Sequence, residues 1–459
     1  MARRGRSRPL IVGLAIGVAA TGMFVARHGD PDPVVGAIAL GPRITSVVMD
    51  EQTGRAFVGI SDDAATTGRL DVLDTATGAV LRVDPLAASP MGIVVDERRR
   101  HVFVSESTGG TAGVVMVDAG SGKILRTVPV GSYPTAVAVD ERAGRLFVAT
   151  PDSAACPRYD TLSPCGKVAV VDTATGQLLR TFTVRGRVTV AAVDGRANRL
   201  IVAGDDGFRG GTVSVLDATS GRPIASVHIR SQLGLGTGHA LAVDERAGRA
   251  FLLGANYPTY TAGAVYVLDT RGGALIRTLA TSTIPTGVAV DSATGRAFVS
   301  TLGHIAHAGV SNHVTSIGQG LVSVLDARSG KVVATAGVGI GAFAVAVSGR
   351  DGRLLVTNVG DVDSSGSDTT FHGTGSVTVL DEHGARVVRT LPTGVFPIGV
   401  LADGRRGRAL VVNYGGTVRV RDAWGWLPPW LRRALPFLPR APKPTRGVAS
   451  SITVLDTSR

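Results

Sequence analysis

Residues 136–148 read Ala-Val-Ala-Val-Asp-Glu-Arg-Ala-Gly-Arg-Leu-Phe-Val, and this stretch decides the fold. A short run of alternating apolar residues ends at an aspartate, a turn closes with glycine, and a second apolar run follows. The pattern predicts two antiparallel strands joined by a hairpin. The pattern or a close variant of it occurs eight times along the chain.

A second phrase alternates with the first, namely an apolar strand that ends in Val-Leu-Asp or a close variant. Its closing residues are Asp74, Asp118, Asp172, Asp217, Asp269, Asp326, Asp381 and Asp456. The first interval is 44 residues and the second is 54 residues, which fits a repeat of four short strands rather than of helix pairs. Because one small sheet cannot bury both faces alone, neighbouring units must stack. The chain is therefore predicted to be all-β, with a single β-propeller over residues 34–459.

The strand count predicts how the ring closes. Eight first, eight second and eight third strands are present, but only seven fourth strands follow a third strand. Residues 34–40 form an apolar strand without a unit of their own, and the chain stops just after the last third strand. We expect this N-terminal strand to complete the last of eight four-stranded antiparallel blades, which removes exposed edges. Seven blades, with one degenerate unit, is the alternative.

The recurrent aspartates are predicted to fasten hairpins. In the turns Asp140–Gly144 and Asp172–Gly176, the carboxylate can accept backbone N–H groups just after it, and the glycine supplies a positive φ. Eight carboxylates in equivalent turns indicate a structural role rather than acid or base catalysis.

The repeat resembles a known family. The cycle Val-x-Val-Leu-Asp, Thr-Ala-Thr-Gly, Pro-x-x-Val-Ala-Val-Asp and Gly-Arg-Leu-Phe-Val is similar to the YVTN, or YncE-like, β-propeller repeat of exported bacterial proteins, and Leu355-Val356-Thr357-Asn358 comes nearest to the name motif. The resemblance covers about residues 34–459 and implies a propeller. Related propellers include lactonases, cofactor-bearing dehydrogenase subunits, surface-layer proteins and binding scaffolds, so it does not imply one function. Members often have seven blades, from which an eighth unit departs.

The N-terminal segment predicts export. Four arginines between residues 3 and 8 precede an uncharged apolar run from Leu10 to Ala26, and the chain then turns polar. Positive charge before such a run is typical of an export signal. We expect residues 1–33 to hold an uncleaved membrane anchor and a short linker, with the propeller outside the cytoplasm. A cleaved signal peptide, with cleavage after Ala20, is the alternative.

The two cysteines of the chain support this compartment. Cys156 and Cys165 lie in one loop between a second and a third strand. A disulfide that closes this loop suits an oxidising, exported compartment. A metal pair or redox couple is less consistent with the sequence, since no Cys-x-x-Cys spacing is present.

The net charge of +12 does not indicate nucleic-acid binding. Residues 1–27 and 421–446 each carry +5, so the blades are close to neutral and no basic stripe alternates with aromatic residues.

The second basic segment lies in an insertion over residues 414–450 that holds all three tryptophans. Its candidate contact residues are Trp424, Trp426, Trp430, Leu431, Arg432, Arg433 and Phe437. Aromatic and leucine side chains beside arginines suit a bilayer surface or a membrane protein, whereas a loop folded over its own propeller is the alternative.

The four long insertions share one position, between a second and a third strand. They span residues 151–166, 302–320, 359–375 and 414–450. Such loops emerge on the same face of a propeller, and function on a rigid scaffold tends to reside in variable loops. We expect this face to bind an unidentified protein, glycan or small molecule.

Two of these insertions carry candidate metal ligands. The first holds His304, His307 and His313, and the second holds Asp361, Asp363 and His372. Histidine with carboxylate can bind a transition metal if the loops converge, whereas solvated loop residues are the alternative. Asp361-Val-Asp363-Ser-Ser-Gly366 resembles the start of a calcium loop, but its twelfth position is His372 instead of glutamate. No cofactor is therefore predicted, and a transition metal or calcium stays open.

Other catalytic signatures are missing from the sequence, including Gly-x-Ser-x-Gly, His-Glu-x-x-His and Cys-x-x-Cys-His. His239 begins an inner strand and is the candidate residue at the mouth of the central channel, with a structural role as the alternative. The favoured interpretation is an exported, membrane-tethered binding scaffold. A propeller enzyme, either a lactonase-like hydrolase or an oxidoreductase subunit, is the alternative. Acidic residues around the channel mouth would favour the enzyme, and a neutral mouth would favour the scaffold.

Overall fold

A computed structural model of the chain shows an all-β protein. It describes residues 33–41, 43–62, 64, 66–107, 112–131, 133–134, 136–151, 166–186, 188–205, 210–233, 240–256, 262–308, 313–349, 352–365, 368–371, 373–381, 383–384, 386–419 and 445–457. No helix occurs in these residues, and so none could cross a membrane. Residues 33–459 form one compact unit. The predicted anchor lies outside the described part and stays a prediction.

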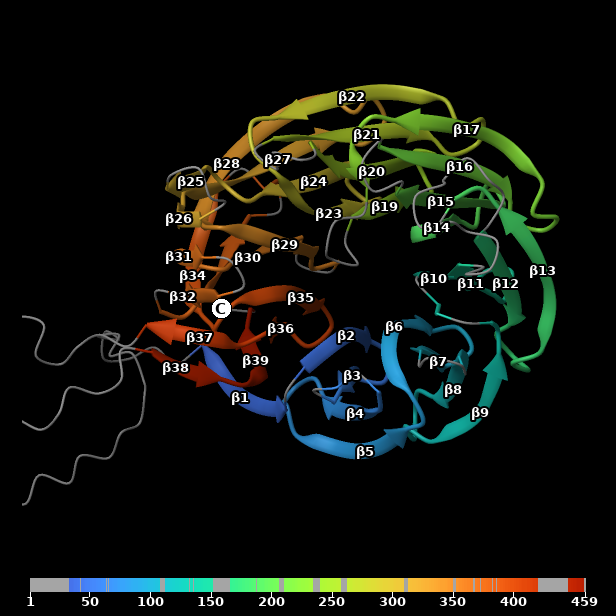
Figure 1. The fold of residues 1–459 in the computed structure, drawn as a ribbon, viewed down its shortest axis with the longest axis horizontal. Helices are drawn as coiled ribbons and strands as arrows, with labels where there is room; N and C mark the ends of the chain where they lie inside the picture. The colour runs from blue at the N-terminus through green and yellow to red at the C-terminus, as the bar shows by residue number, and fades with distance from the viewer. Residues whose placement is uncertain are drawn as a thin grey trace, which may run out of the picture. The chain divides into compact units, whose positions relative to one another are not determined.

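Eight antiparallel sheets surround a common axis as the blades of a β-propeller (Figure 1). Blade 1 consists of β2 (Arg43–Asp50), β3 (Arg55–Ser61), β4 (Gly68–Asp74) and β5 (Val80–Leu86). Blade 2 consists of β6 (Ser89–Asp96), β7 (His101–Ser107), β8 (Ala112–Asp118) and β9 (Ile124–Pro129). Blade 3 consists of β10 (Ala136–Asp140), β11 (Arg145–Pro151), β12 (Gly166–Asp172) and β13 (Leu178–Val184). Blade 4 consists of β14 (Val188–Asp194), β15 (Arg199–Asp205), β16 (Gly211–Asp217) and β17 (Pro223–Ile229).

The second half of the ring repeats this order. Blade 5 consists of β18 (Gln232–Leu233), β19 (Leu241–Asp244), β20 (Arg249–Ala255), β21 (Gly263–Asp269) and β22 (Leu275–Thr281), in which β18 and β19 both pair with β20. Blade 6 consists of β23 (Pro285–Asp291), β24 (Arg296–Thr301), β27 (Gln319–Asp326) and β28 (Val332–Ile340). Blade 7 consists of β29 (Ala342–Val347), β30 (Leu354–Asn358), β33 (Ser376–Leu380) and β34 (Val387–Pro392).

Blade 8 closes the ring with strands from both ends of the chain. Its inner three strands are β35 (Pro397–Asp403), β36 (Arg408–Asn413) and β39 (Ser450–Asp456), and its outermost strand is β1 (Val34–Gly41). The pairing of β1 with β39 is antiparallel, with Ala37 opposite Thr453 and Ile38 opposite Ile452. The predicted eight-blade ring and its closure by the N-terminal strand are therefore confirmed.

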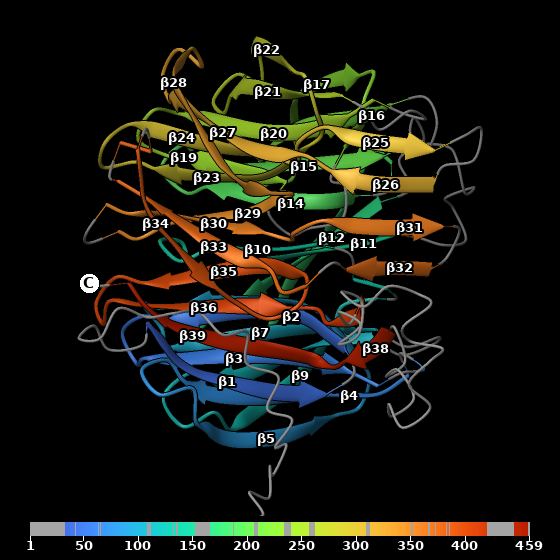
Figure 2. The ribbon, with the colours of Figure 1, turned by 90° about the vertical axis from the view of Figure 1, so that its left-hand side faces the viewer.

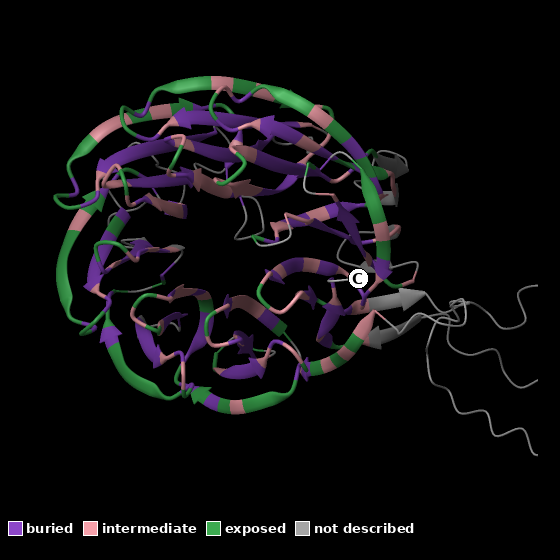
Figure 3. Ribbon diagram, turned by 180° about the vertical axis from the view of Figure 1, so that it is seen from behind, coloured by how far each residue is buried: buried purple, intermediate pink, exposed green. Residues whose placement is uncertain are grey.

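The core lies between blades. The third residue of the second strand is phenylalanine in five blades, and these rings rank among the largest fully buried side chains: Phe57, Phe103, Phe147, Phe251 and Phe298. One cluster joins Phe57, Leu70 and Val72 of blade 1 to Val102 and Val104 of blade 2, for example. Burial falls toward the rim, where the outermost strands are largely exposed (Figure 3). Stacking of neighbours, rather than any single blade, therefore buries the apolar faces.

The turns have the predicted geometry. Asp140 Oδ1 accepts the Ala143 N–H at 2.9 Å, and Asp172 Oδ1 accepts the Thr175 N–H at 2.7 Å. Gly144 and Gly176 close these turns at φ of 68° and 67°, a region that favours glycine. The aspartates therefore act as hairpin fasteners, as the sequence indicated.

Candidate functional site

The propeller presents two different faces. We call the side of the short hairpins, which join first to second and third to fourth strands, the turn face. The opposite side carries the links between second and third strands and the crossings to the next blade, and we call it the loop face. Each face offers polar or apolar groups that could form a site.

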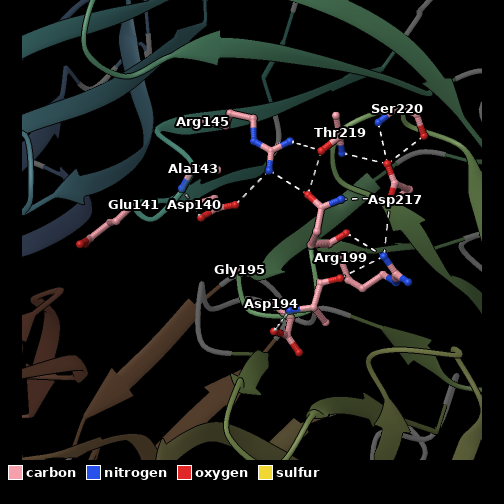
Figure 4. Close-up of polar contacts among 12 residues, drawn as sticks. Asp140, Glu141, Ala143, Arg145, Asp194, Gly195, Arg199, Asp217, Thr219 and Ser220 are labelled. Atoms are coloured by element: carbon pink, nitrogen blue, oxygen red, sulfur yellow. Dashed lines mark hydrogen bonds and ion pairs between the residues drawn. The ribbon is translucent and has the colours of Figure 1, made fainter.

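On the turn face, polar side chains are engaged between blades. Arg145 of blade 3 donates to Asn198 Oδ1 at 2.8 Å and to Thr219 Oγ1 at 2.7 Å, both in blade 4 (Figure 4). It also contacts Asp140 Oδ2 in its own blade at 3.3 Å. The Asn198 amide in turn donates to Asp217 Oδ2 at 3.0 Å. These bonds connect two hairpins, and this explains the polar cluster without a ligand.

Turn arginines of other blades also donate to a neighbouring blade, in this case to a backbone carbonyl. Arg99 of blade 2 donates to the Glu141 carbonyl of blade 3 at 2.7 Å, and Arg406 of blade 8 donates to the Glu51 carbonyl of blade 1 at 2.9 Å. We call these contacts the arginine clips. A second contact runs from a threonine hydroxyl to the buried turn aspartate of the previous blade, as from Thr270 to Asp194 at 2.5 Å. The turn face is therefore a fastening surface.

The electrostatics of the half-buried turn aspartates agree with this role. The Ser121 hydroxyl holds the pKa of Asp118 below its ordinary value, and the Ser329 hydroxyl does the same for Asp326. Hydrogen bonds to an ionised carboxylate favour the charged form. These groups stay ionised acceptors near neutral pH, which suits a turn fastener and not a general acid.

The loop face carries a feature of another kind, a six-stranded sheet that we call the accessory sheet. Its strands run in the order β25, β26, β31, β32, β37 and β38. Their bounds are Ile305–Ala308, His313–Ile317, Val362–Ser365, Asp368–Phe371, Gly416–Arg419 and Thr445–Val448. Three hairpins from blades 6, 7 and 8 thus join outside the propeller, and Figure 2 shows the strands together at one end of the molecule. The predicted convergence of the insertions on one face is observed for these three.

Pairing across blades holds the accessory sheet together. Val314 in β26 lies opposite Ser364 in β31, and β32 pairs in parallel with β37 through Thr370 and Thr417. The Asp361 carboxylate accepts the N–H of Ile317 at 3.0 Å, which ties the blade 7 insertion to the blade 6 insertion. The three insertions therefore form one surface instead of three separate loops.

An apolar cluster anchors the accessory sheet to the propeller. Ile317 at the end of β26 and Val448 at the end of β38 pack with Val395, which is 4% exposed. Phe396 in the same cluster makes edge-to-face contacts with Phe343 at 6.0 Å and with Tyr414 at 6.1 Å between ring centroids. Such packing fixes the sheet relative to blades 7 and 8.

The innermost strands share a break in pairing register at their loop-face ends. It occurs in six blades, and the residues skipped are Thr45, Met91, Thr189, Thr286, Phe343 with Ala344, and Ile398. β-Bulges of this kind re-aim side chains near the rims of β structures. None of these residues is ionisable, and the Thr286 hydroxyl donates a hydrogen bond to the Ala342 carbonyl at 2.9 Å. The described bulge positions therefore supply no acidic group.

The predicted metal ligands are not gathered into a described site. His304 lies just before β25, and His307, His313 and Asp363 lie within strands of the sheet. Asp361 is engaged by the Ile317 N–H, and His372 lies outside the described residues. Among the described side chains, no group of three His, Cys, Asp or Glu residues could hold a metal ion. The metal site stays a prediction.

Several other predicted residues also lie outside the described part of the chain. They are Cys156, Cys165, His239 and the seven candidate contact residues between Trp424 and Phe437. The disulfide, the channel-mouth histidine and the membrane contact therefore stay predictions. The described strands β37 and β38 flank the tryptophan-bearing insertion and pair from Gly416–Val448 to Arg419–Thr445.

Sequence reasoning missed the accessory sheet. It placed the insertions on one face but interpreted them as loops. Short alternating runs such as His-Val-Thr-Ser-Ile at residues 313–317 and Thr-Val-Arg at 417–419 were the available signal. Runs of three to five residues are too short to be assigned without their strand partners, which come from other blades.

Solved structures similar to this chain are β-propellers. The Dos1 propeller has a TM-score of 0.56 at 11% sequence identity, with 92% of this chain and 94% of that chain covered. Dihydro-heme d1 dehydrogenase NirN in complex with DHE has a TM-score of 0.51 at 14% identity, covering 84% of this chain and 78% of that one. BamB from Moraxella catarrhalis has a TM-score of 0.44 at 18% identity, covering 69% and 82%. No protein-family model matches the chain, and no curated protein matches its sequence. The likeness to Dos1 and NirN supports the fold alone, and the chain is a β-propeller repeat protein.

Proposed function

We propose that this chain is an extracytoplasmic, membrane-tethered β-propeller of the YVTN type that serves as a binding scaffold through its loop face. The observation that carries the proposal is the accessory sheet. Three consecutive blades each add a hairpin at the same position, and the hairpins pair into one six-stranded sheet. A propeller does not need such a sheet to close, because closure already comes from β1 and β39.

The chemistry of the loop face suits binding more than catalysis. Described bulge positions are neutral, and the Asp361 carboxylate is engaged by a backbone N–H. A rigid ring that presents an extended, anchored surface is typical of recognition. The partner of this face is a protein, glycan or small molecule.

The tryptophan-bearing segment at residues 421–446 would supply the second contact, with a membrane surface or a membrane protein. Its base is held by four residue pairs between β37 and β38, so the segment starts and ends on the accessory sheet. Its sequence combines Trp424, Trp426 and Trp430 with Arg432 and Arg433. Aromatic rings and arginines side by side suit the headgroup region of anionic lipid.

Liposome flotation tests this contact. Residues 30–459, which lack the apolar run, are mixed with vesicles of phosphatidylcholine with and without phosphatidylserine. The expected result is flotation with the anionic vesicles and at least a fivefold loss on the double change Trp424→Ala and Trp430→Ala. Binding to a membrane protein instead of lipid would appear as recruitment only to native membranes.

A matched control uses an apolar pair elsewhere on the surface. Leu178 and Leu179 on β13 are 47% and 49% exposed, and both are changed to alanine. This variant should float like the parent. If the parent protein binds neither vesicles nor native membranes, the proposed membrane contact is wrong. Ligand binding by the loop face is a separate proposal, which this result would leave standing.

A further inference from the structure

The two edges of the accessory sheet differ. β38 forms one edge and β25 forms the other, and each has one strand neighbour among the described strands. β38 contains Arg446 and follows Lys443 and Pro444 in sequence. Charged residues and proline are the common means by which proteins keep an open edge from pairing. β25 reads Ile305-Ala306-His307-Ala308 and has neither lysine, arginine nor proline.

The accessory sheet itself grows by edge pairing. Hairpins from separate blades pair edge to edge, β26 with β31 and β32 with β37. The accessory sheet is therefore assembled by pairing between strand edges. Among the described strands the accessory sheet ends at β25, and no described strand of blade 5 belongs to it. The edge of β25 thus continues an interface that the chain already uses twice.

We propose that β25 pairs with β25 of a second copy of this chain, in an antiparallel arrangement about a twofold axis. The edge suits its own copy because β25 contains no lysine, arginine or carboxylate residue, and each residue near a twofold axis occurs twice. The product is one continuous sheet with six strands from each copy. This contact is separate from the tryptophan-bearing segment, so either can fail without the other.

Cysteine cross-linking tests the pairing directly. In an antiparallel pair, opposed Cα atoms lie about 4.5 or 5.5 Å apart, within the range of a disulfide. Ala306→Cys and His307→Cys are made separately in the full chain, which is solubilised in nonionic detergent and oxidised mildly. Cross-linking of one variant with itself places the axis at that residue, and cross-linking only in their mixture places it between the two.

Two controls make the result specific. The unchanged chain reports any cross-linking through Cys156 and Cys165, and Thr445→Cys places a cysteine on the opposite edge, in β38. Neither is expected to give a dimer band above background on a non-reducing gel. A band of equal strength from Thr445→Cys would overturn the assignment to β25.

Sedimentation velocity supplies a readout that does not depend on cysteine. The full chain in detergent should show a concentration-dependent dimer. Ala306→Lys places two like charges near the axis and should raise the dimer dissociation constant at least tenfold, whereas Thr445→Lys should leave it unchanged. Circular dichroism checks that each variant is folded. A parent that stays monomeric without cross-links, or a dimer that Ala306→Lys does not weaken, would overturn the proposal.

Discussion

The turn face and the loop face are built from the same eight repeats, yet they differ in how they use them. On the turn face, equivalent residues make equivalent contacts, as in the arginine clips of Arg99 and Arg406. On the loop face, hairpins of three blades pair with one another, and no described strand of the other five blades joins them. The ring therefore separates its tasks: one face fastens blades and the other is free to vary.

The reason is geometric. A hairpin of four or five residues can be satisfied by its own aspartate and by the next blade, so most repeats keep the same residue types there. A loop between second and third strands needs only two adjacent strand ends, and insertions there leave the blade intact. The following predictions test this separation, in order of expected effect.

Gly144→Ala is expected to destabilise the protein most. At φ of 68° a Cβ is strained, and it would lie 2.5 Å from Arg99 Nη2, which displaces the arginine clip. Gly295 has the same φ of 68° but no heavy atom within 4 Å of such a Cβ. Urea unfolding should give a loss of about 2–3 kcal/mol for Gly144→Ala and about 1 kcal/mol for Gly295→Ala. Equal losses would mean that the clip contributes nothing.

Thr270→Val should lower the free energy of unfolding by about 1–3 kcal/mol, since it leaves the buried Asp194 carboxylate without its hydroxyl donor.

The opposite substitution, which adds a hydroxyl donor, can be made between blades 5 and 6. Asp244 is fully buried, and its Oδ2 has no hydrogen-bond partner within the described part; blade 6 has Ala327 where blade 5 has Thr270. Ala327→Thr should raise stability by about 1 kcal/mol, and Ala327→Val, which adds bulk without a hydroxyl, should not.

Glu106→Gln is expected to remove part of the pH dependence of stability. Burial raises the pKa of Glu106, while the backbone N–H groups of Ala88 and Ala87 lower it in part. A folded-state pKa above the unfolded value means that the folded state holds the proton longer, so stability falls as pH rises through that interval. The variant should therefore be more stable than the parent above the raised pKa. Urea midpoints from pH 4 to pH 8 check this, and parallel curves for the two proteins would contradict it.

Arg100→Gly should stabilise the protein slightly. Arg100 occupies the turn position that holds glycine in blades 1 and 3, at φ of 56°. Glycine adopts this region without strain, and the expected gain is about 0.5–1 kcal/mol. Asn198→Gly is the contrasting change. Asn198 has φ of 55° but also accepts from Arg145 and donates to Asp217, so glycine there should give no gain in urea unfolding.

Replacement of residues 421–443 by a short Gly-Ser linker should change stability least. The base of the insertion keeps its four pairs between β37 and β38, and blade 8 keeps β36 and β39. The urea midpoint should stay within about 0.5 kcal/mol of the parent. A large loss of stability would show that this insertion helps to hold the ring together. It would contradict the division of roles between the two faces.

The degree to which the sequence predicts this molecule varies with how local the interactions are. Turn aspartates, turn glycines and strand alternation depend on residues within about ten positions, and the blades follow from them. The arginine clips were not predicted, because Arg99 and its acceptor Glu141 are 42 residues apart. The hydrogen bond from the Ile317 N–H to Asp361 was equally hidden, because these two residues are 44 positions apart.

The sequence by itself determined the all-β class, the eight repeats and the closure of the ring by residues 34–40, because each rests on short-range alternation and on counting strands. Only the tertiary structure decided that three insertions become one accessory sheet, because strands of four or five residues are stable only with partners, and those partners arrive from neighbouring blades. It also decided which turn carboxylates are fully hydrogen-bonded, because Asp194 accepts from Thr270 of the next blade whereas Asp244 Oδ2 has no partner in the described part of the chain.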